Sequence, residues 1–154
     1  MLLDIAAFTD LLHNASLIHD DLIDDDAERR GYSTPWKKYG KDKALLLGDL
    51  LIAKSLTVSA GMNADSDVKA AWASEISNCV TSAVRGAFKE LDFVSQASDD
   101  IISNYIEMSR DKTGVMFALP ARCVAIAARK NQVCLDSITD ICLLYTSPSP
   151  RDCQ

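Results

Sequence analysis

The sequence predicts an all-α fold, on three observations. Apolar residues recur at spacings of three and four, which place them on one side of a helix. Glycine, proline and short polar clusters separate these segments, as expected at helix ends. No two-residue hairpin turn lies between segments of alternating apolar and polar residues, so strand signals are weak.

The first expected helix occupies the beginning of the chain. Its apolar residues form the stripe of a core-facing helix, and they are Leu2, Ile5, Phe8, Leu11, Leu12, Ala15, Ile18 and Leu22. A polar loop is expected over residues 25–40, where Gly31, Pro35 and Gly40 interrupt the pattern. A second helix is expected from Lys43 to Ala60, ending at Gly61.

Polar residues mark the starts of two further helices. A third helix is expected over residues 66–96 and a fourth over residues 98–112, each opening on Ser and Asp residues that suit a helix N-cap. The fourth would continue past Gly114 and Pro120, with a kink.

The last thirteen residues differ in kind from the rest. The segment 142–154, CLLYTSPSPRDCQ, abandons helical periodicity, is rich in Ser and Pro, and resembles the translation of a cloning or sequencing adaptor. A natural disordered tail is the alternative. We therefore expect one domain over residues 1–141, followed by a disordered tail.

Composition narrows the class of protein. Hydrophobic residues make up 48% of the chain and charged residues 25%, which favours a globular protein over a disordered one. The net charge of −6 disfavours nucleic acid and anionic membranes as main partners. Charges or polar clusters interrupt every apolar stretch, so no membrane span is expected. No basic region precedes a short apolar run at the N-terminus, so no signal peptide is expected.

The five cysteines are widely spaced and include no CxxC pair. This pattern disfavours a zinc site and favours small buried thiols in a reducing compartment. We therefore expect a cytoplasmic protein, or one of an organelle matrix if a transit peptide is missing.

The chemistry is concentrated near the end of the first expected helix. Asp20 and Asp24 are four residues apart, so their carboxylates share one face of a helix, with Asp21 beside them. Carboxylates at this spacing repel one another unless a cation joins them, and hard oxygen ligands favour Mg²⁺ or Mn²⁺. Arg29 and Arg30 follow, with forked donors that suit phosphate. Together these residues indicate a site for a metal–diphosphate complex.

The acidic run has two other interpretations. A solvated helix end is common, although acids at a C-terminal end oppose the helix dipole and so call for a reason. A calcium-binding EF-hand loop fails, because a loop starting at Asp24 has Arg29 at its sixth position, where the turn requires glycine.

The acidic run resembles the first aspartate-rich motif of the trans-prenyltransferases, also called polyprenyl diphosphate synthases, in which DDxxD is followed by RRG. The resemblance covers roughly residues 1 to 140. It extends in order over the HNASLIHDD helix, the Thr34-Pro35-Trp36 and Tyr39-Gly40 loop, the ALLLGDLL segment at 44–51, VRGAFKE at 84–90, and Lys112-Thr113-Gly114. It implies part of the isoprenoid synthase helical bundle.

The resemblance also implies a role for each matching residue. Asp20 and Asp24 would be Mg²⁺ ligands that hold an allylic diphosphate, with Asp21 supporting them. The residues implied at the allylic diphosphate are Arg29, Lys112 and Thr113, and those implied at isopentenyl diphosphate are Arg30 and His13. His19 points away from this face and is expected to be a packing or surface residue.

The implied reaction needs no nucleophilic side chain. Diphosphate would depart with the help of metal ions and cationic residues, and isopentenyl diphosphate would attack the allylic carbocation. Ala15 and Ser16, one turn before the motif, are small. In this family, small residues there go with geranylgeranyl or longer polyprenyl products, although they also permit close helix packing.

Some family elements are missing from this chain. The resemblance implies an upstream Gly-Gly-Lys-Arg-type segment and a second DDxxD, so we expect a fragment truncated at both ends that lacks its N-terminal helices and its C-terminal half. Asp99-Asp100 cannot be the second motif, because no acid stands three residues after Asp100. Glu90 stands where the family usually has Gln, and Ala87 where it has Glu. A polypeptide with half of the metal ligands is expected to be inactive.

Other functions were also considered. A class I terpene cyclase shares the helical fold but uses one diphosphate, whereas Arg29, Arg30, His13 and Lys112 favour two substrates. A non-catalytic subunit of a heteromeric prenyl synthase usually has a degraded aspartate motif, and this one is intact. A helical interaction domain would not bind Mg²⁺–diphosphate. The family resemblance also implies a homodimer or heterodimer.

Overall fold

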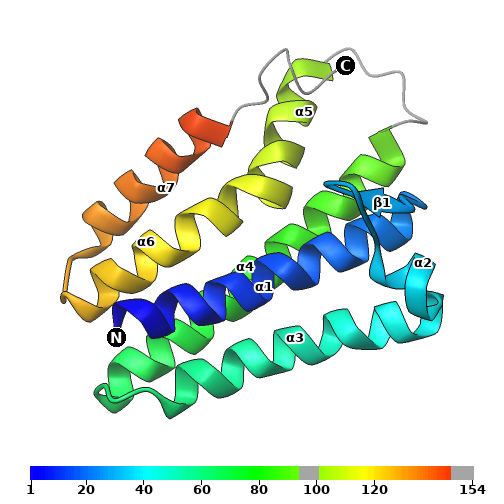
Figure 1. Cartoon of the computed structure of the whole chain (residues 1–154). Helices are drawn as coiled ribbons and strands as arrows, with labels where there is room; N and C mark the ends of the chain where they lie inside the picture. The colour runs from blue at the N-terminus through cyan, green and yellow to red at the C-terminus, as the bar shows by residue number, and fades with distance from the viewer. Residues whose placement is uncertain (94–100, 147–154) are drawn as a thin grey trace. The chain divides into compact units, whose positions relative to one another are not determined.

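The computed structural model describes residues 1–93 and 101–146 (Figure 1). Most of these residues are helical, so the predicted all-α class is confirmed. The chain divides into two compact units, residues 1–63 and residues 64–154, which are described separately below.

The first unit is built on two long helices that lie side by side (Figure 1). They are α1 (Leu2–Ile23) and α3 (Lys41–Gly61). Between them the chain forms β1 (Glu28–Arg29), β2 (Tyr32–Ser33) and the short helix α2 (Pro35–Tyr39). Proline suits the first position of α2, because its fixed φ is helical and its missing N–H would have no partner there.

Large side chains of α1 and small side chains of α3 are buried. The buried residues of α1 include Ile5, Phe8, Leu12, Ala15 and Ile18, and those of α3 are Ala44, Gly48, Ser55 and Ser59. Each set recurs at spacings that keep it on one side of its helix. Small residues allow the backbone of α3 to approach its neighbour closely. Leu2, expected on the same stripe, is exposed instead.

The polar loop contains a hairpin that the sequence analysis did not predict. Glu28 pairs with Ser33 and Arg29 with Tyr32, leaving Arg30 and Gly31 as a two-residue turn. Both turn residues have positive φ, 53° for Arg30 and 81° for Gly31. A two-residue turn with this backbone matches the twist of the strands that it joins, so it can close even a very short ladder.

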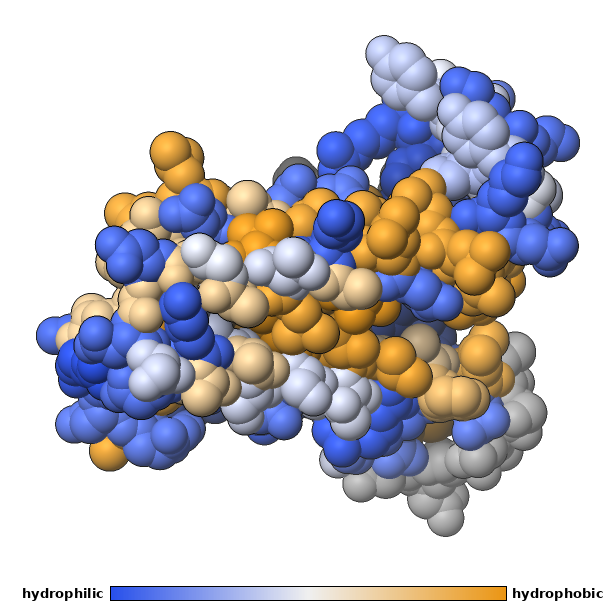
Figure 2. Space-filling model, turned by 90° about the horizontal axis from the view of Figure 1, so that it is seen from below, coloured by the Kyte–Doolittle hydropathy of each residue, from blue (hydrophilic) through white to orange (hydrophobic). Residues whose placement is uncertain are grey.

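One face of α3 exposes leucines. They are Leu45, Leu46, Leu50 and Leu56. Figure 2, which views the molecule from the side where α3 lies in Figure 1, shows hydrophobic surface gathered on that side. Among the described residues, α3 is the one helix long and apolar enough to cross a membrane, and 22% of its most apolar window is buried. No apolar stretch of this length was expected from the sequence. The charged residues Asp49 and Lys54 lie within α3, but they do not prevent it from being long and apolar enough. Length and composition alone are weak evidence for a span.

The second unit begins with the longest helix described. Its elements are α4 (Ser66–Phe93), α5 (Ile101–Ser109), the π-helical turn η1 (Arg110–Gly114), α6 (Val115–Ala127) and α7 (Gln132–Thr146). The chain continues past Gly114 as helix, as expected: the π-helical turn ends at Gly114, and Pro120 lies inside α6. The expected helix start at residues 98–100 lies outside the described residues. Helix α7 continues to Thr146, five residues into the expected tail, whose remaining residues also lie outside the described part.

Trp72 is the largest fully buried side chain. It projects from α4, and its indole N–H donates a hydrogen bond of 2.9 Å to the carbonyl of Cys123 on α6. The same helix buries Val68, Ile76 and Cys79 at spacings of three and four. Trp72 therefore links the packing of α4 to the backbone of α6.

A bidentate ion pair joins the same two helices and reaches α7. Arg122 on α6 donates to both carboxylate oxygens of Glu75 on α4, at 2.6 and 2.8 Å. Its remaining nitrogen donates to the carbonyl of Leu135 and the hydroxyl of Thr139, both on α7. These contacts lie beside a pocket of about 340 Å³ between α4, α6 and α7. Four hydrogen bonds thus tie this guanidinium to α4 and α7.

Two of the cysteines behave as the sequence analysis expected. Burial raises the pKa of the Cys79 and Cys123 thiols to about 12, so both are protonated at neutral pH. Cys134 and Cys142 are half-buried, and Cys153 lies outside the described residues. The four described cysteines are free thiols.

Candidate functional site

The acidic run lies at the C-terminal end of α1. Asp20 belongs to the last turn, and Asp24 is the C-cap, whose N–H donates to the Asp20 carbonyl at 2.8 Å. Asp25 adopts a φ of 56°, and the N–H of Asp26 donates to the Asp21 carbonyl at 3.0 Å. This is the hydrogen-bond pattern of a helix closed by one left-handed residue. The end of α1 is therefore fixed by the acidic run itself, without a glycine.

Asp21 has a different environment from the other two aspartates. Its side chain is 3% exposed, and Arg29 donates to its Oδ1 through Nε at 2.8 Å and Nη2 at 2.6 Å. The hydrogen bond to Asp21 raises the pKa of Arg29 above its ordinary value. Asp20 is half-buried and Asp24 is exposed. The structure thus assigns Asp21 to Arg29 and separates it from the Asp20–Asp24 pair.

The burial of Asp21 bears on the metal site expected at Asp20, Asp21 and Asp24. Within residues 1–93 and 101–146, no group of three or more His, Cys, Asp or Glu side chains is assembled to hold a metal ion. Asp21, which the sequence analysis placed with Asp20 and Asp24, has its carboxylate buried against the Arg29 guanidinium. Asp20 and Asp24 remain one helical turn apart, and Mg²⁺ commonly takes one or two protein carboxylates together with phosphate oxygens. The donor set therefore fits Mg²⁺ bound jointly with a phosphate ligand.

The two arginines after the motif are held by the β1–β2 hairpin. Arg29 is on β1 and turns back to α1 through Asp21, whereas Arg30 occupies the turn and is exposed. Trp36 and Thr34 secure the base of the hairpin by donating to the Asp26 carbonyl at 2.7 and 2.8 Å. Arg30 is exposed in the turn, while Arg29, whose side chain is 38% exposed, pairs with Asp21.

The remaining expected residues on α1 lie one or two turns before the motif. His13 is exposed, and its carbonyl accepts a 2.8 Å hydrogen bond from the Ser16 hydroxyl. Ser16 is half-buried, but Ala15 is 1% exposed and belongs to the core. The packing interpretation therefore applies to Ala15, and Ser16 is the more accessible of the two small residues.

His19 packs between α1 and α3. Its Nε2 lies 3.3 Å from the carbonyl of Leu45. A Cβ added at Gly48 would come within 2.1 Å of that same nitrogen. Gly48 therefore leaves room for the imidazole ring, which explains why glycine occurs in the ALLLGDLL segment.

The other expected site residues lie in the second unit, on the π-helical turn. Lys112 and Thr113 are both part of η1. Lys112 is half-buried, and its ammonium donates to Glu90 on α4, the position where the resemblance expects glutamine. Thr113 is exposed. π-helical turns are rare and often occur at functional sites, so the location of Lys112 on one is notable.

Gly86 allows α4 to touch this turn. Gly86 is buried, and a Cβ placed there would come within 2.4 Å of the Lys112 backbone nitrogen. Any side chain at this position would collide with backbone atoms, which cannot rotate away. The glycine of the VRGAFKE segment therefore determines how closely η1 approaches α4.

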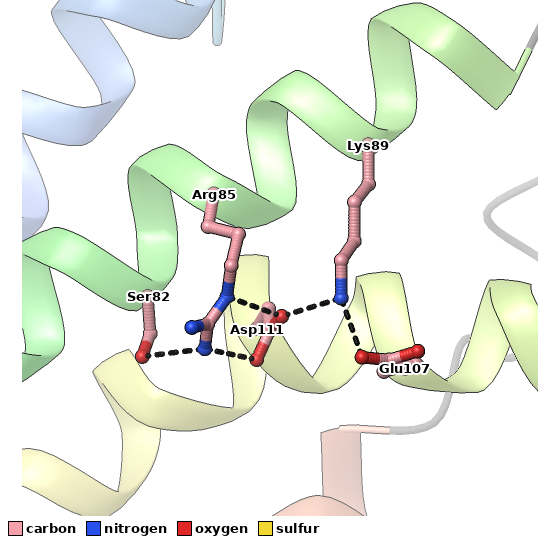
Figure 3. A network of polar contacts seen from close by, with 5 residues as sticks. All are labelled: Ser82, Arg85, Lys89, Glu107 and Asp111. Atoms are coloured by element: carbon pink, nitrogen blue, oxygen red, sulfur yellow. Dashed lines mark hydrogen bonds and ion pairs between the residues drawn. The ribbon is translucent and has the colours of Figure 1, made fainter.

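A polar network also stabilises the contact between α4 and η1 (Figure 3). Asp111, 8% exposed, accepts from Arg85 at 3.0 and 3.2 Å and from Lys89 at 2.9 Å. Lys89 also donates to Glu107 at 2.6 Å, and Arg85 lies 3.4 Å from the Ser82 hydroxyl. Burial raises the pKa of Asp111, but the hydrogen bonds from Arg85 and Lys89 outweigh it and hold that pKa below its ordinary value.

This network was not predicted, although the sequence contains a signal for it. Arg85 and Lys89 are four residues apart on one helix, and Glu107 and Asp111 are four apart on the next helical segment. Two cations on one helical face and two acids on another are able to pair across helices. The spacing could have suggested the contact, but not its partner helix.

Comparison with known proteins identifies the family of this chain. A family model described as Polyprenyl synthetase matches residues 1–145. A geranylgeranyl pyrophosphate synthase of Geoglobus acetivorans is 31% identical over 121 residues, which are 79% of this chain and 38% of that protein. A (2E,6E)-farnesyl diphosphate synthase of Mycobacterium tuberculosis is 33% identical over 123 residues, which are 80% of this chain and 33% of that protein.

Solved structures agree with the sequence relatives. The geranylgeranyl pyrophosphate synthetase of Pyrococcus horikoshii superimposes with a TM-score of 0.81 at 30% identity, over 88% of this chain and 41% of that one. The chain thus spans about two fifths of the length of the relatives it matches. The match to the family model over nearly the whole chain confirms the resemblance seen in the motifs, and the chain belongs to the polyprenyl synthetase family, with part of its helical fold.

Proposed function

We propose that this chain takes part in prenyl transfer, in which an allylic diphosphate condenses with isopentenyl diphosphate. The single observation that carries the proposal is the pair Asp20 and Asp24, one turn apart at the end of α1, followed by a hairpin that presents Arg30. Carboxylates for a metal and a cation for phosphate are the donors that such substrates require. Family membership supports the same reaction class.

Each residue has a defined part in this proposal. Asp20 and Asp24 hold Mg²⁺, or Mn²⁺, against the diphosphate of the allylic substrate. The bound metal supplies charge neutralisation for the leaving diphosphate. Arg29 holds Asp21 through Nε and Nη2, and its partly exposed guanidinium has further N–H groups for the allylic diphosphate. Arg30 and His13 are exposed and available to the diphosphate of isopentenyl diphosphate.

Lys112 and Thr113 are proposed to contact the allylic diphosphate. The ammonium of Lys112 is balanced by Glu90 when no substrate is bound. A diphosphate carries more charge than one carboxylate, so it competes favourably with Glu90 for the ammonium. We further propose a product of geranylgeranyl length or longer, since Ser16 places no bulky side chain one turn before Asp20. A second chain, identical or related, is the proposed protein partner.

The carboxylate pair can be tested by binding. With Mg²⁺ present, the protein should bind geranyl diphosphate in a calorimetric titration, and binding should disappear when the metal is chelated. Asp20→Asn and Asp24→Asn should each weaken binding at least about tenfold, because even the outer-shell partners of a metal commonly contribute that much. Asp10→Asn is the matched control, since it removes an exposed carboxylate from the same helix, more than two turns away.

The outcomes separate the proposal from its rivals. Equal affinity with and without Mg²⁺, or equal affinity of the Asp10, Asp20 and Asp24 variants, would show that the carboxylates do not bind a metal–diphosphate complex. If the wild-type protein bound neither the metal nor the diphosphate, a non-catalytic helical partner would be the better description.

Turnover by a polypeptide of residues 1–154 alone is expected to be very low. These residues contain one DDxxD motif, at the end of α1, and stabilisation of the departing diphosphate would lack the ligands of a second. The measurement is an assay with geranyl or farnesyl diphosphate, labelled isopentenyl diphosphate and Mg²⁺. Robust formation of a labelled product would contradict this expectation and would show that one motif suffices.

A further inference from the structure

The backbone around Lys112 rests on one short segment of α4, residues 85–90. Gly86 is in direct contact with the Lys112 backbone, and Glu90, one turn later, accepts from its ammonium. Arg85 and Lys89, on the same segment, both bind Asp111. Gly86 and Glu90 therefore meet Lys112 itself, and Arg85 and Lys89 bind the residue directly before it.

Asp111 is the most buried charge in this arrangement. Its side chain is 12% exposed, against 33% for Lys89 and 57% for Arg85. Three charge-assisted hydrogen bonds satisfy it, two of them from the fork of one guanidinium. A buried acceptor that loses such donors carries the cost of its own desolvation, so Asp111 has a strong preference for this one position.

The polar network carries no net charge, so its contribution is to hold the backbone next to Lys112 in place. Arg85 and Lys89 are two positive groups, Glu107 and Asp111 are two negative groups, and their formal charges cancel (Figure 3). A neutral cluster adds little to the long-range potential that an approaching diphosphate would meet. Its effect on Lys112 must therefore be exerted through the backbone that the two neighbouring residues share.

A π-helical turn makes such an effect important. Turns of this kind are poorly populated by themselves and persist where the surroundings hold them in place. On one side η1 is held by the bonds of Asp111 to α4, and on the other Arg110 pairs with Asp140 of α7 at 3.3 Å. Of these two contacts, that of Asp111 is the one that is both buried and multiply bonded.

We infer that Asp111 is the positioning residue of Lys112. Its clamp between Arg85 and Lys89 holds the π-helical turn against Gly86 and thereby sets the direction in which the Lys112 ammonium projects. The inference rests on the proposed function, in that it takes Lys112 to be a diphosphate contact. Asp111 itself touches no substrate in this arrangement.

A double-mutant cycle tests this inference, with Mg²⁺ and geranyl diphosphate as the probe. Asp111→Asn should weaken binding about fivefold in the wild-type background, within the usual range for coupled neighbours. In the Lys112→Ala background, the same change should have no further effect, because the group that Asp111 positions is gone. A general loss of structure would weaken binding in both backgrounds alike.

Two further variants complete the test. Asp140→Asn makes the same chemical change on the other side of η1 and should leave affinity unchanged. Lys89→Met removes one donor and leaves the Arg85 fork in place, so it should produce a smaller, Lys112-dependent loss even if Asp111→Asn fails to fold. Circular dichroism would confirm that each variant keeps its helix content.

The outcomes distinguish this inference from the proposed function. If Asp111→Asn and Lys89→Met leave affinity unchanged, or weaken it equally with and without Lys112, the inference is wrong while the metal–diphosphate site stands. If Lys112→Ala alone has no effect on binding, the role of Lys112 is wrong and the inference fails with it. If the wild-type protein does not bind the probe, the proposed function itself is overturned.

Discussion

Replacing Trp72 with alanine should lower the free energy of unfolding of the second unit by about 3–5 kcal/mol, the range for truncating a fully buried tryptophan. The side chain is 0% exposed, so the substitution would leave a large cavity between α4 and its neighbours. It would also leave the Cys123 carbonyl without its indole donor. Urea denaturation followed by far-UV circular dichroism measures the loss.

Two companion variants make the Trp72 result interpretable. Trp72→Phe keeps most of the apolar volume but removes the N–H, so it should be distinctly less destabilising than alanine. Phe117→Ala truncates an aromatic residue on α6 that is 57% exposed, and it should change stability by less than about 0.5 kcal/mol. If Trp72→Ala and Phe117→Ala had similar effects, Trp72 would not be a core residue.

Replacing Gly86 with leucine should destabilise the second unit by about 3 kcal/mol or more, at the upper end of the cost of overpacking. The new side chain would meet the backbone of Lys112, where a Cβ alone already comes within 2.4 Å. To relieve the clash, η1 would have to leave α4, which would break the Asp111 clamp. Thermal unfolding would detect the loss of stability, and the titration with geranyl diphosphate would detect displacement of Lys112.

The other glycines provide matched comparisons for Gly86. Gly61→Ala, at the end of α3, meets no atom within 4 Å and should be neutral or stabilising by up to about 1 kcal/mol. The nearest atoms to the new methyl group of Gly48→Ala belong to the His19 ring, a side chain that can rotate, so its cost should be intermediate. A Gly86 variant as stable as the Gly61 variant would contradict the close approach of η1 and α4.

Helices were predictable from this sequence because their information is local. The spacing of Ile5, Phe8 and Leu12 predicted α1, and Gly61 marked the end of α3 within one residue. Local patterns also located the aspartate pair, since a spacing of four defines one helical face without any knowledge of the fold. The family motif at Lys112-Thr113-Gly114 identified Lys112 and Thr113 as candidate site residues, although the sequence did not predict that they lie on a π-helical turn.

The missed features depend on contacts between segments distant in sequence or on unusual backbone. The β1–β2 hairpin closes on Arg-Gly, which lacks the Asn or Asp that normally announces such a turn. The polar network joins Arg85 to Asp111, 26 residues away, and no local pattern selects that pair. Asp21 was grouped with its neighbours because adjacency in sequence does not reveal which carboxylate turns toward Arg29.

The hairpin turn has a consequence for directed evolution. Arg30 holds a left-handed backbone, which costs an L-residue with a bulky side chain roughly 1–2 kcal/mol, whereas glycine adopts it freely and asparagine more readily. A library selected for heat resistance alone should therefore enrich glycine or asparagine at codon 30. Either substitution would remove the exposed guanidinium proposed to bind isopentenyl diphosphate. Selection for thermal stability and selection for enzymatic activity would therefore favour different residues at this position.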